Sequence, residues 1–132
     1  MNNRSLPQIV ALTFGAIYLL VGVLGLIPFF GGSYTQTSSD LLGFVPINLL
    51  HNIVHLVIGV AGLAAASSMS RSRLFAQVFG SVLLLVGLLG IVTSNPLSLI
   101  PIGGADIAIH LLTGAVLAYV GFASPVAVRR AA

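Results

Sequence analysis

Two pairs of ionisable side chains stand out because each lies inside a strongly apolar stretch. His51 and His55 are four residues apart, and so are Asp106 and His110. The chain of 132 residues has five basic, two acidic and three histidine residues, and the two pairs contain four of these. Residues spaced i, i+4 lie on the same face of a helix. The pairs therefore predict a polar layer inside an apolar, helical protein.

The chemistry that this layer predicts is the binding of a metal or cofactor. Two imidazoles on one helical face can chelate a divalent metal, and a third imidazole with a carboxylate completes a set of three nitrogen ligands and one oxygen ligand. The candidate metal ligands are His51, His55, Asp106 and His110. Alternatively, His55 and His110 are axial ligands of a haem or ligands of a chlorophyll magnesium. Asn48 and Asn52 are placed to hydrogen-bond these ligands from outside.

Two other interpretations fit the same residues. In the first, the polar side chains hydrogen-bond one another and water and fix the helix register, with bonds worth about 0.6–2 kcal/mol each; Asp106 then caps its helix. In the second, the layer handles protons or a small solute, since ionisable residues within membrane helices mark functional sites by default. The spacing leaves all three interpretations open.

The composition excludes a soluble globular protein. It is 58% hydrophobic and 5% charged, whereas soluble domains carry about 25% charged residues. Four apolar stretches, each near the ~20 residues that a helix needs to cross a bilayer, are Pro7–Phe30, Ile47–Ala66, Leu74–Thr93 and Ala105–Ala123. Polar backbone must be hydrogen-bonded internally within lipid, so these stretches predict spanning helices. The first is too long for a secretory signal and no cleavage site follows it, so we expect it to be retained.

The predicted fold is an all-α membrane protein, a single four-helix transmembrane bundle over residues 1–132. Short connections make consecutive helices antiparallel neighbours. Two tandem α-hairpin repeats, about residues 7–66 and 74–123, build the bundle, because residues 20–27 match 85–92 and residues 55–59 match 110–114. A repeated two-helix unit keeps its direction across the membrane. The repeat makes His55 equivalent to His110, and His51 equivalent to Asp106; a chance likeness of apolar helices is the alternative.

The arginines predict the orientation of the chain. They flank the apolar stretches on one side, at Arg4, Arg71, Arg73, Arg129 and Arg130, and Asp40 and Asp106 lie on or near the other side. The positive-inside rule then places both termini and the 67–73 connection in the cytoplasm. The basic charge encodes orientation, so we expect no nucleic-acid partner. Cysteine, lysine and glutamate are absent, which excludes thiol and Schiff-base chemistry and acid catalysis by glutamate.

Small residues predict which faces pack together, because they let membrane helices approach closely. The glycines at 15 and 22, 80 and 87, and 114 and 121 are each seven residues apart. The histidines share faces with glycines and should point inward. We expect lipid to contact Leu, Ile and Val side chains and the aromatic residues Phe29, Phe30 and Phe122, and we expect interhelical contacts from Gln8, Tyr18 and Gln77.

The segment from Asn48 to Gly62, together with Tyr18 to Gly25, resembles a bacterial family of small four-span membrane proteins whose function is unknown. Its most specific part is His51-Asn-Ile-Val-His55-Leu56, and a later acid-x-x-x-His-Leu motif is carried by Asp106 and His110. The likeness covers nearly the whole chain, although the outer loop is short and tryptophan is absent. It implies the fold and a bacterial inner (cytoplasmic) or thylakoid membrane, and it supplies no activity.

Two functions are compatible with these features. The first is a non-catalytic accessory or assembly subunit of a larger membrane complex, with lipid, other membrane subunits or a second copy as partners and with a metal or tetrapyrrole in the His/Asp layer. The alternative is a stand-alone small transporter or membrane redox protein that uses the same layer. Four short-looped helices argue against a transporter unless the protein forms oligomers.

Overall fold

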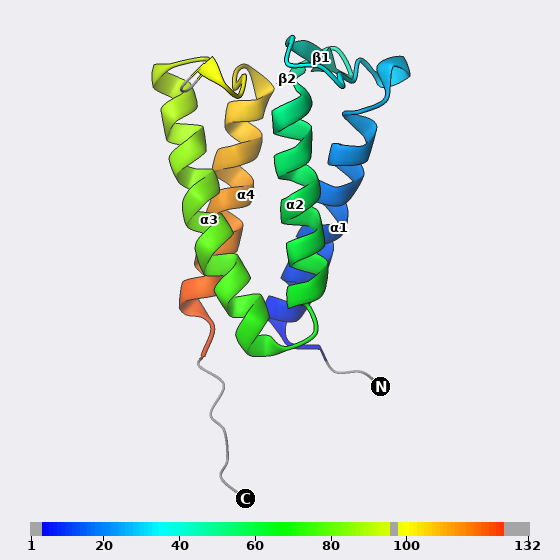
Figure 1. The fold of residues 1–132 in the computed structure, drawn as a ribbon. Helices are drawn as coiled ribbons and strands as arrows, with labels where there is room; N and C mark the ends of the chain where they lie inside the picture. Colours follow the sequence, from blue (N-terminus) through cyan, green and yellow to red (C-terminus); the bar gives the residue numbers. More distant parts are fainter. Residues whose placement is uncertain (1–3, 96–97, 126–132) are drawn as a thin grey trace, which may run out of the picture.

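The computed structural model describes residues 4–95 and 98–125, a range that excludes Arg129 and Arg130. This part of the chain is mostly helical, with helices α1 (Leu6–Leu24), α2 (Leu49–Ala65), α3 (Met69–Val92) and α4 (Ala105–Ala123). The helices lie side by side, each running opposite to the one before (Figure 1). α1, α3 and α4 are long and apolar enough to cross a membrane, and α2 is a shorter apolar helix of 17 residues. The chain thus has the character of a membrane protein.

Two helix boundaries differ from the predicted ones by more than two residues. α1 ends at Leu24 instead of Phe30, because Gly25 closes its last turn and Pro28 starts a separate 3-10 turn, η1 (Pro28–Phe30). Proline lacks the N–H that a continuing helix needs. α3 begins at Met69 instead of Leu74, because the Ser68 hydroxyl accepts a hydrogen bond from the Arg71 N–H (3.4 Å) as an N-cap. The expected 67–73 connection is therefore mostly the first turn of a helix.

The outer loop folds into a small β-hairpin that the all-α expectation missed. β1 (Ser39–Leu41) pairs antiparallel with β2 (Val45–Ile47). The connecting turn holds Leu42 and Gly43 at positive φ. Buried side chains of both strands pack on α1 and on Phe30 of η1. Phe30 is therefore partly buried and is not the lipid-facing residue that we expected. Phe29 and Phe122 are exposed as expected.

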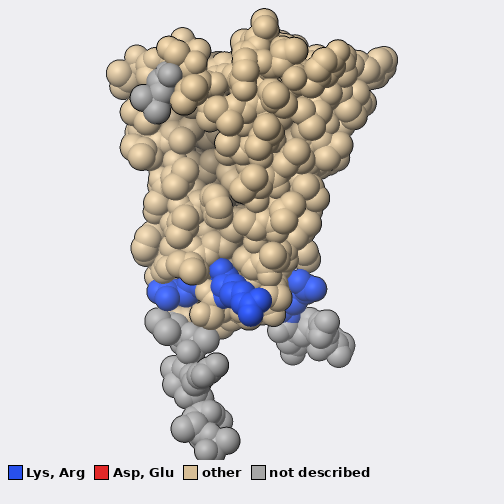
Figure 2. Space-filling model, in the orientation of Figure 1, with Lys and Arg blue, Asp and Glu red and all other residues tan. Residues whose placement is uncertain are grey.

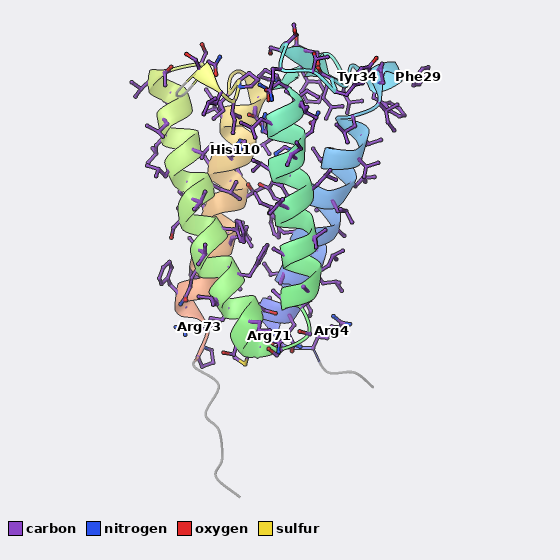
Figure 3. All side chains as sticks on the ribbon, in the orientation of Figure 1. Arg4, Phe29, Tyr34, Arg71, Arg73 and His110 are labelled. Atoms are coloured by element: carbon purple, nitrogen blue, oxygen red, sulfur yellow. The ribbon has the colours of Figure 1, made fainter. Side chains whose placement is uncertain are left out.

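The molecule has two distinct ends. One carries the β-hairpin and the connection between α3 and α4; we call it the β-hairpin end (Figure 1). The other carries the start of α1, the connection between α2 and α3 and the end of α4. Arg4, Arg71 and Arg73 all lie at this second end, the arginine end (Figures 2 and 3).

Glycines bring the helices together in two tight pairs, α1 with α2 and α3 with α4. A Cβ atom on Gly15 would lie 2.7 Å from the backbone nitrogen of Leu63, and one on Gly114 would lie 2.7 Å from the backbone nitrogen of Leu84. Real Cβ atoms do not approach backbone so closely. The predicted glycine-rich faces are therefore buried contact faces.

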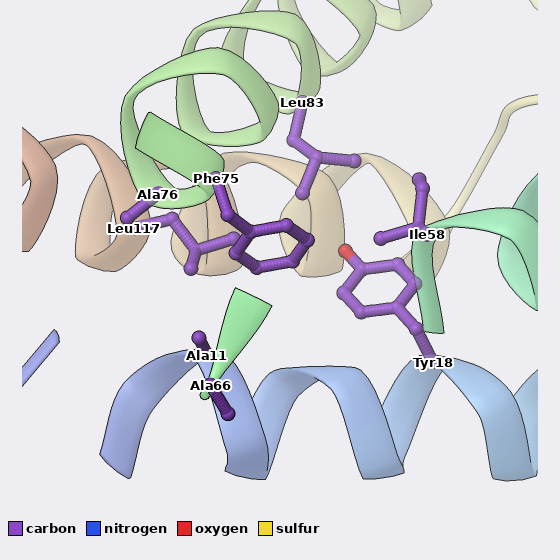
Figure 4. Packing of buried hydrophobic residues seen from close by; sticks show 8 residues of the cluster. All are labelled: Ala11, Tyr18, Ile58, Ala66, Phe75, Ala76, Leu83 and Leu117. Carbon is purple, nitrogen blue, oxygen red and sulfur yellow. The ribbon is translucent and has the colours of Figure 1, made fainter. Parts of the chain in front are cut away.

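The two helix pairs meet in a shared core and through polar side chains. Phe75 of α3 and Leu117 of α4 are buried in the same cluster as Ile58 of α2 and Tyr18 of α1 (Figure 4). The Tyr18 hydroxyl shares a 3.0 Å hydrogen bond with the Thr113 hydroxyl, which joins α1 to α4. Within the pairs, the side-chain amides of Gln8 and Gln77 donate to the carbonyls of Ala66 (3.1 Å) and Gly121 (3.0 Å). The expected interhelical roles of both glutamines and Tyr18 are confirmed.

Replacing Gly15 by alanine tests whether backbone contact holds the first pair together. Alanine gains up to about 1 kcal/mol of helix propensity over glycine, but overpacking a close contact costs about 1–3 kcal/mol. Because the neighbouring atoms are backbone and cannot rotate away, we expect a net loss of about 1–2 kcal/mol in the free energy of unfolding. The measurement is an unfolding titration with sodium dodecyl sulfate in mixed micelles, followed by circular dichroism.

Gly103→Ala is the matched control, since a Cβ there would meet only one side-chain atom, at 3.8 Å. We expect this variant to unfold like the wild type. Equal stability of the two variants would contradict the role given to Gly15.

Candidate metal centre

Three histidine side chains converge between α2 and α4. His51 and His55 come from consecutive turns of α2, and His110 comes from the second turn of α4. Each offers one ring nitrogen to a set in which all the nitrogens lie within 4.8 Å of one another. The side chains are buried, with exposed fractions of 2% for His51 and 4% for His55 and His110. The predicted convergence of the three imidazoles is thus present in the structure.

The helix starts position these rings near the β-hairpin end, because α2 and α4 both begin there; Figure 3 labels His110 in this half of the molecule. α2 begins at Leu49 because the Asn48 side chain accepts a hydrogen bond from the His51 N–H (2.9 Å). This cap fixes His51 in the first turn of the helix and His55 one turn further along. Their ring centroids are 4.4 Å apart, and the His110 ring lies 5.9 Å from His51 and 6.4 Å from His55.

Asp106 supports the group from behind His110. One carboxylate oxygen lies 3.2 Å from His110 Nδ1, and the Asp106 carbonyl oxygen lies 2.9 Å from the same nitrogen. A carbonyl oxygen can only accept, so Nδ1 carries the proton and Nε2 of the neutral ring is free to act as a ligand. A carboxylate that orients an imidazole in this way is the usual outer partner of a metal-binding histidine. Asp106 is 1% exposed, and it is not in the close set formed by the three histidines.

Asp106 does not cap its helix. The residue at the N-cap of α4 is Gly104, and no side chain hydrogen-bonds this cap within residues 4–95 and 98–125. The capping role that we considered for Asp106 is therefore wrong, because its carboxylate turns along the helix toward His110.

Several buried nitrogens of the group have no hydrogen-bond partner in the described part of the chain. These are both ring nitrogens of His51 and Nδ1 of His55. The carbonyl groups of Pro46 and Pro101 lie near the His51 ring but outside hydrogen-bond geometry. An unpaired buried polar group costs about 1–3 kcal/mol, so such groups in native proteins call for an explanation.

Asn48 and Asn52 do not hydrogen-bond the imidazole rings as expected. Besides capping α2, Asn48 donates to the carbonyl of Leu99 (2.8 Å). Asn52 donates to the carbonyls of Gly25 (2.6 Å) and Ser33 (2.9 Å). Both asparagines therefore fasten loops around the site. An asparagine directly before an apolar helix is an N-cap signal, so the role of Asn48 was readable from the sequence, whereas that of Asn52 depends on the loop path.

Sequence reasoning also missed two neighbours of the histidines. The Tyr18 ring packs edge-on against His55, with ring centroids 5.3 Å apart and planes at 74°. A cavity of about 230 Å³ adjoins all three imidazoles and is otherwise lined by aliphatic side chains. Neither feature has a signal in local spacing, because both depend on how the two helix pairs meet.

The chain matches one protein family over residues 8–123, which is most of its length. It belongs to the DUF4383 family. The family is described as a domain of unknown function, so the expected membership of an uncharacterised family is confirmed without an activity. Comparisons with curated proteins and with solved structures give no match. For this DUF4383 chain, function must be argued from its own residues.

Asn52→Leu in this DUF4383 domain tests the fastening of the loop after α1. Leucine removes two buried hydrogen bonds. The Gly25 carbonyl still accepts from the Ser33 N–H (2.8 Å), but the Ser33 carbonyl loses its Asn52 partner, which costs about 1–3 kcal/mol. We expect the free energy of unfolding in mixed micelles to fall by about 1–3 kcal/mol. Asn95→Leu, at an exposed position, is the matched control and should change stability by less than about 0.5 kcal/mol. A stable Asn52→Leu variant would show that these bonds contribute little.

Proposed function

We propose that this protein is a small integral membrane subunit that binds one divalent transition-metal ion through His51, His55 and His110. The observation that carries the proposal is the convergence of three buried ring nitrogens within 4.8 Å. Nitrogens bound to one ion at about 2.0–2.1 Å lie roughly 3.3 Å apart in tetrahedral geometry. Small rotations of the rings would bring the nitrogens to this spacing, and an ion would bind one ring nitrogen of each histidine, including one of the two His51 nitrogens that lack a hydrogen-bond partner in the described residues.

Two observations favour a metal ion over the alternatives, and the ligand type indicates which metals. The unpaired nitrogens of His51 argue against a layer of side chains that satisfy one another. Three ring nitrogens within 4.8 Å of one another suit a single ion, whereas a haem or chlorophyll needs a wide slot between two axial imidazoles. Imidazole nitrogens favour zinc, copper, iron or nickel over magnesium or calcium.

An accessory role agrees better with the cavity than a transport role does. The cavity reaches residues of α2, α3 and α4 in the half nearest the β-hairpin end, whereas a transport path needs access from both sides of the membrane. The outward faces of the helices carry exposed apolar side chains such as Val57, Val60 and Leu112. These faces suit lipid and neighbouring membrane subunits.

We infer that all four helices cross the membrane and that the arginine end is cytoplasmic. α1 and α3 are both candidate spans that start at the arginine end (Figure 1). α2 joins the far end of α1 to the start of α3, so it must cross as well, although it is short. The arginines at this end support the cytoplasmic assignment through the positive-inside rule.

The matching contacts of the two helix pairs support a duplicated hairpin. Gly15 of α1 contacts Leu63 of α2, and 65 and 55 residues later Gly80 of α3 contacts Ala118 of α4. Gly22 meets Leu56, and with the same offsets Gly87 meets Leu111. Equivalent contacts at constant offsets favour an internal repeat over a chance likeness of glycine-rich helices. The repeat then makes His51 equivalent to Asp106. This position carries a proposed metal ligand in the first half and, in the second half, the carboxylate that lies beside His110.

Removing one imidazole tests the metal site. We expect wild-type protein loaded with zinc or cobalt and dialysed to hold one ion per chain, and His55→Ala to lose it, because two imidazoles bind much more weakly than three. Asp106→Asn should weaken binding about 10–100-fold, the usual effect of losing an outer carboxylate. The measurement is elemental analysis with a cobalt titration.

Tyr18→Phe is the control, since it keeps a ring beside His55 and should hold the ion normally. Unchanged metal content in folded His55→Ala would contradict the proposed metal site. A Soret band in the purified wild type would instead support the tetrapyrrole alternative.

Single cysteines test the orientation, since the native chain contains none. Ser38 lies in the outer loop and Ser70 at the arginine end, and both are exposed. In intact cells we expect a membrane-impermeant maleimide to label Ser38→Cys and to label Ser70→Cys only after the membrane is permeabilised. The reverse pattern would invert the orientation, and labelling of both variants in intact cells would contradict a crossing by α2.

A further inference from the structure

A second hollow, which we call the α2/α3 groove, lies where the two tight helix pairs meet near the arginine end. Its walls are apolar, with Ala61 and Ala65 from α2 and Leu74, Val78 and Phe79 from α3. The alanine methyl groups leave room that longer side chains would fill, and the groove has a volume of about 280 Å³. It shares no residue with the cavity beside the histidines.

A cation lies at the arginine end of this groove. Arg71, in the first turn of α3, lines the groove and is exposed, and Figure 3 labels it at that end. Its guanidinium donates to the Ser67 hydroxyl (3.3 Å), which orients it and leaves further N–H donors for a ligand. The two acidic side chains, Asp40 and Asp106, belong to the β-hairpin end. Neither carboxylate therefore neutralises Arg71.

The length of the groove matches one leaflet of a bilayer. From Arg71 to Phe79, α3 advances roughly 12 Å, and the hydrocarbon region of one leaflet is about 15 Å thick. Leu74 and Val78 are 60% and 47% exposed on a helix long and apolar enough to cross a membrane. An apolar cavity of about 150 Å³ holds benzene, so the groove has room for a section of an acyl chain.

We propose that the α2/α3 groove binds a phospholipid with an anionic headgroup, with the phosphate on the Arg71 guanidinium and one acyl chain between α2 and α3. Guanidinium groups form charge-assisted, often bidentate hydrogen bonds with phosphate, and a cation at the membrane surface favours anionic lipids. The apolar walls take the chain, so the ligand is a lipid and not free phosphate. This site goes beyond the proposed metal centre and does not depend on it.

The test uses a tryptophan reporter, because the native chain contains no tryptophan. Val60→Trp places it at a 58% exposed position of α2, next to Ala61 of the groove. The full chain is reconstituted in vesicles of phosphatidylcholine with brominated acyl chains, which quench tryptophan on contact. Unbrominated phosphatidylglycerol is then mixed in. We expect it to relieve quenching about fivefold more effectively than unbrominated phosphatidylcholine, the factor that one arginine contributes at a membrane surface.

Two matched pairs of variants are made in this reporter chain. Arg71→Gln should abolish the preference for phosphatidylglycerol, whereas Arg4→Gln removes the same charge from the same end, outside the groove, and should keep it. Val78→Phe fills the groove at a 47% exposed position and should weaken the preference at least twofold. Val116→Phe, at a 46% exposed position of α4 outside the groove, should keep it. Circular dichroism shows that each variant is folded.

The outcomes decide between this lipid and the other possible occupants. Equal relief by the two unbrominated lipids in the reporter chain would overturn the proposal. A loss of preference as large in Arg4→Gln as in Arg71→Gln would show a general attraction to the arginine end, and a full preference in Val78→Phe would show a surface charge without a groove; each overturns it. Weak quenching by brominated lipid alone would show that a second protein chain covers the groove. The metal content of the protein is unaffected by any of these results.

Discussion

Direct contact between helix backbones is the constraint on which the rest of this structure depends. Lipid tails are as apolar as leucine side chains, so membrane helices gain little from hiding apolar surface and associate through close packing and hydrogen bonds. Gly15, Gly59 and Gly62 let α1 and α2 touch, and Gly80 and Gly114 do the same for α3 and α4. Each pair is thereby a rigid unit, and the position of every other side chain follows from how the two units meet.

The contact between the units differs from one end of the molecule to the other. Toward the arginine end it is filled by Phe75 and its aliphatic neighbours, which form a conventional apolar core. The hydrogen bond between Tyr18 and Thr113 joins the units further along. Toward the β-hairpin end the contact contains the imidazoles and the cavity instead of close-packed carbon. Core packing thus secures the fold in one half and leaves the other half available for chemistry.

Features that depend on period and composition could be predicted from the sequence, whereas features that depend on the path of the chain could not. Apolar length and i, i+4 spacing predicted the helices and the convergence of His51, His55 and His110. Gly25 and Pro28 form a local helix-end signal that apolar length alone overlooked, whereas periodicity could not show that a β-hairpin follows. The lateral cavity also escaped prediction, because it arises from side chains of three helices whose relative rotation no local pattern specifies.

The order of the site residues along the chain has a consequence for biogenesis. His51 and His55 belong to α2, whereas Asp106 and His110 follow roughly fifty residues later. Domains form from the N-terminus first during synthesis, so α2 is made before α4 exists. Its imidazoles are then without their final neighbours, and unpaired polar groups in apolar surroundings are costly. The polar group is therefore completed only by the last helix to be synthesised, and a chain that stops after α2 holds His51 and His55 without Asp106 and His110.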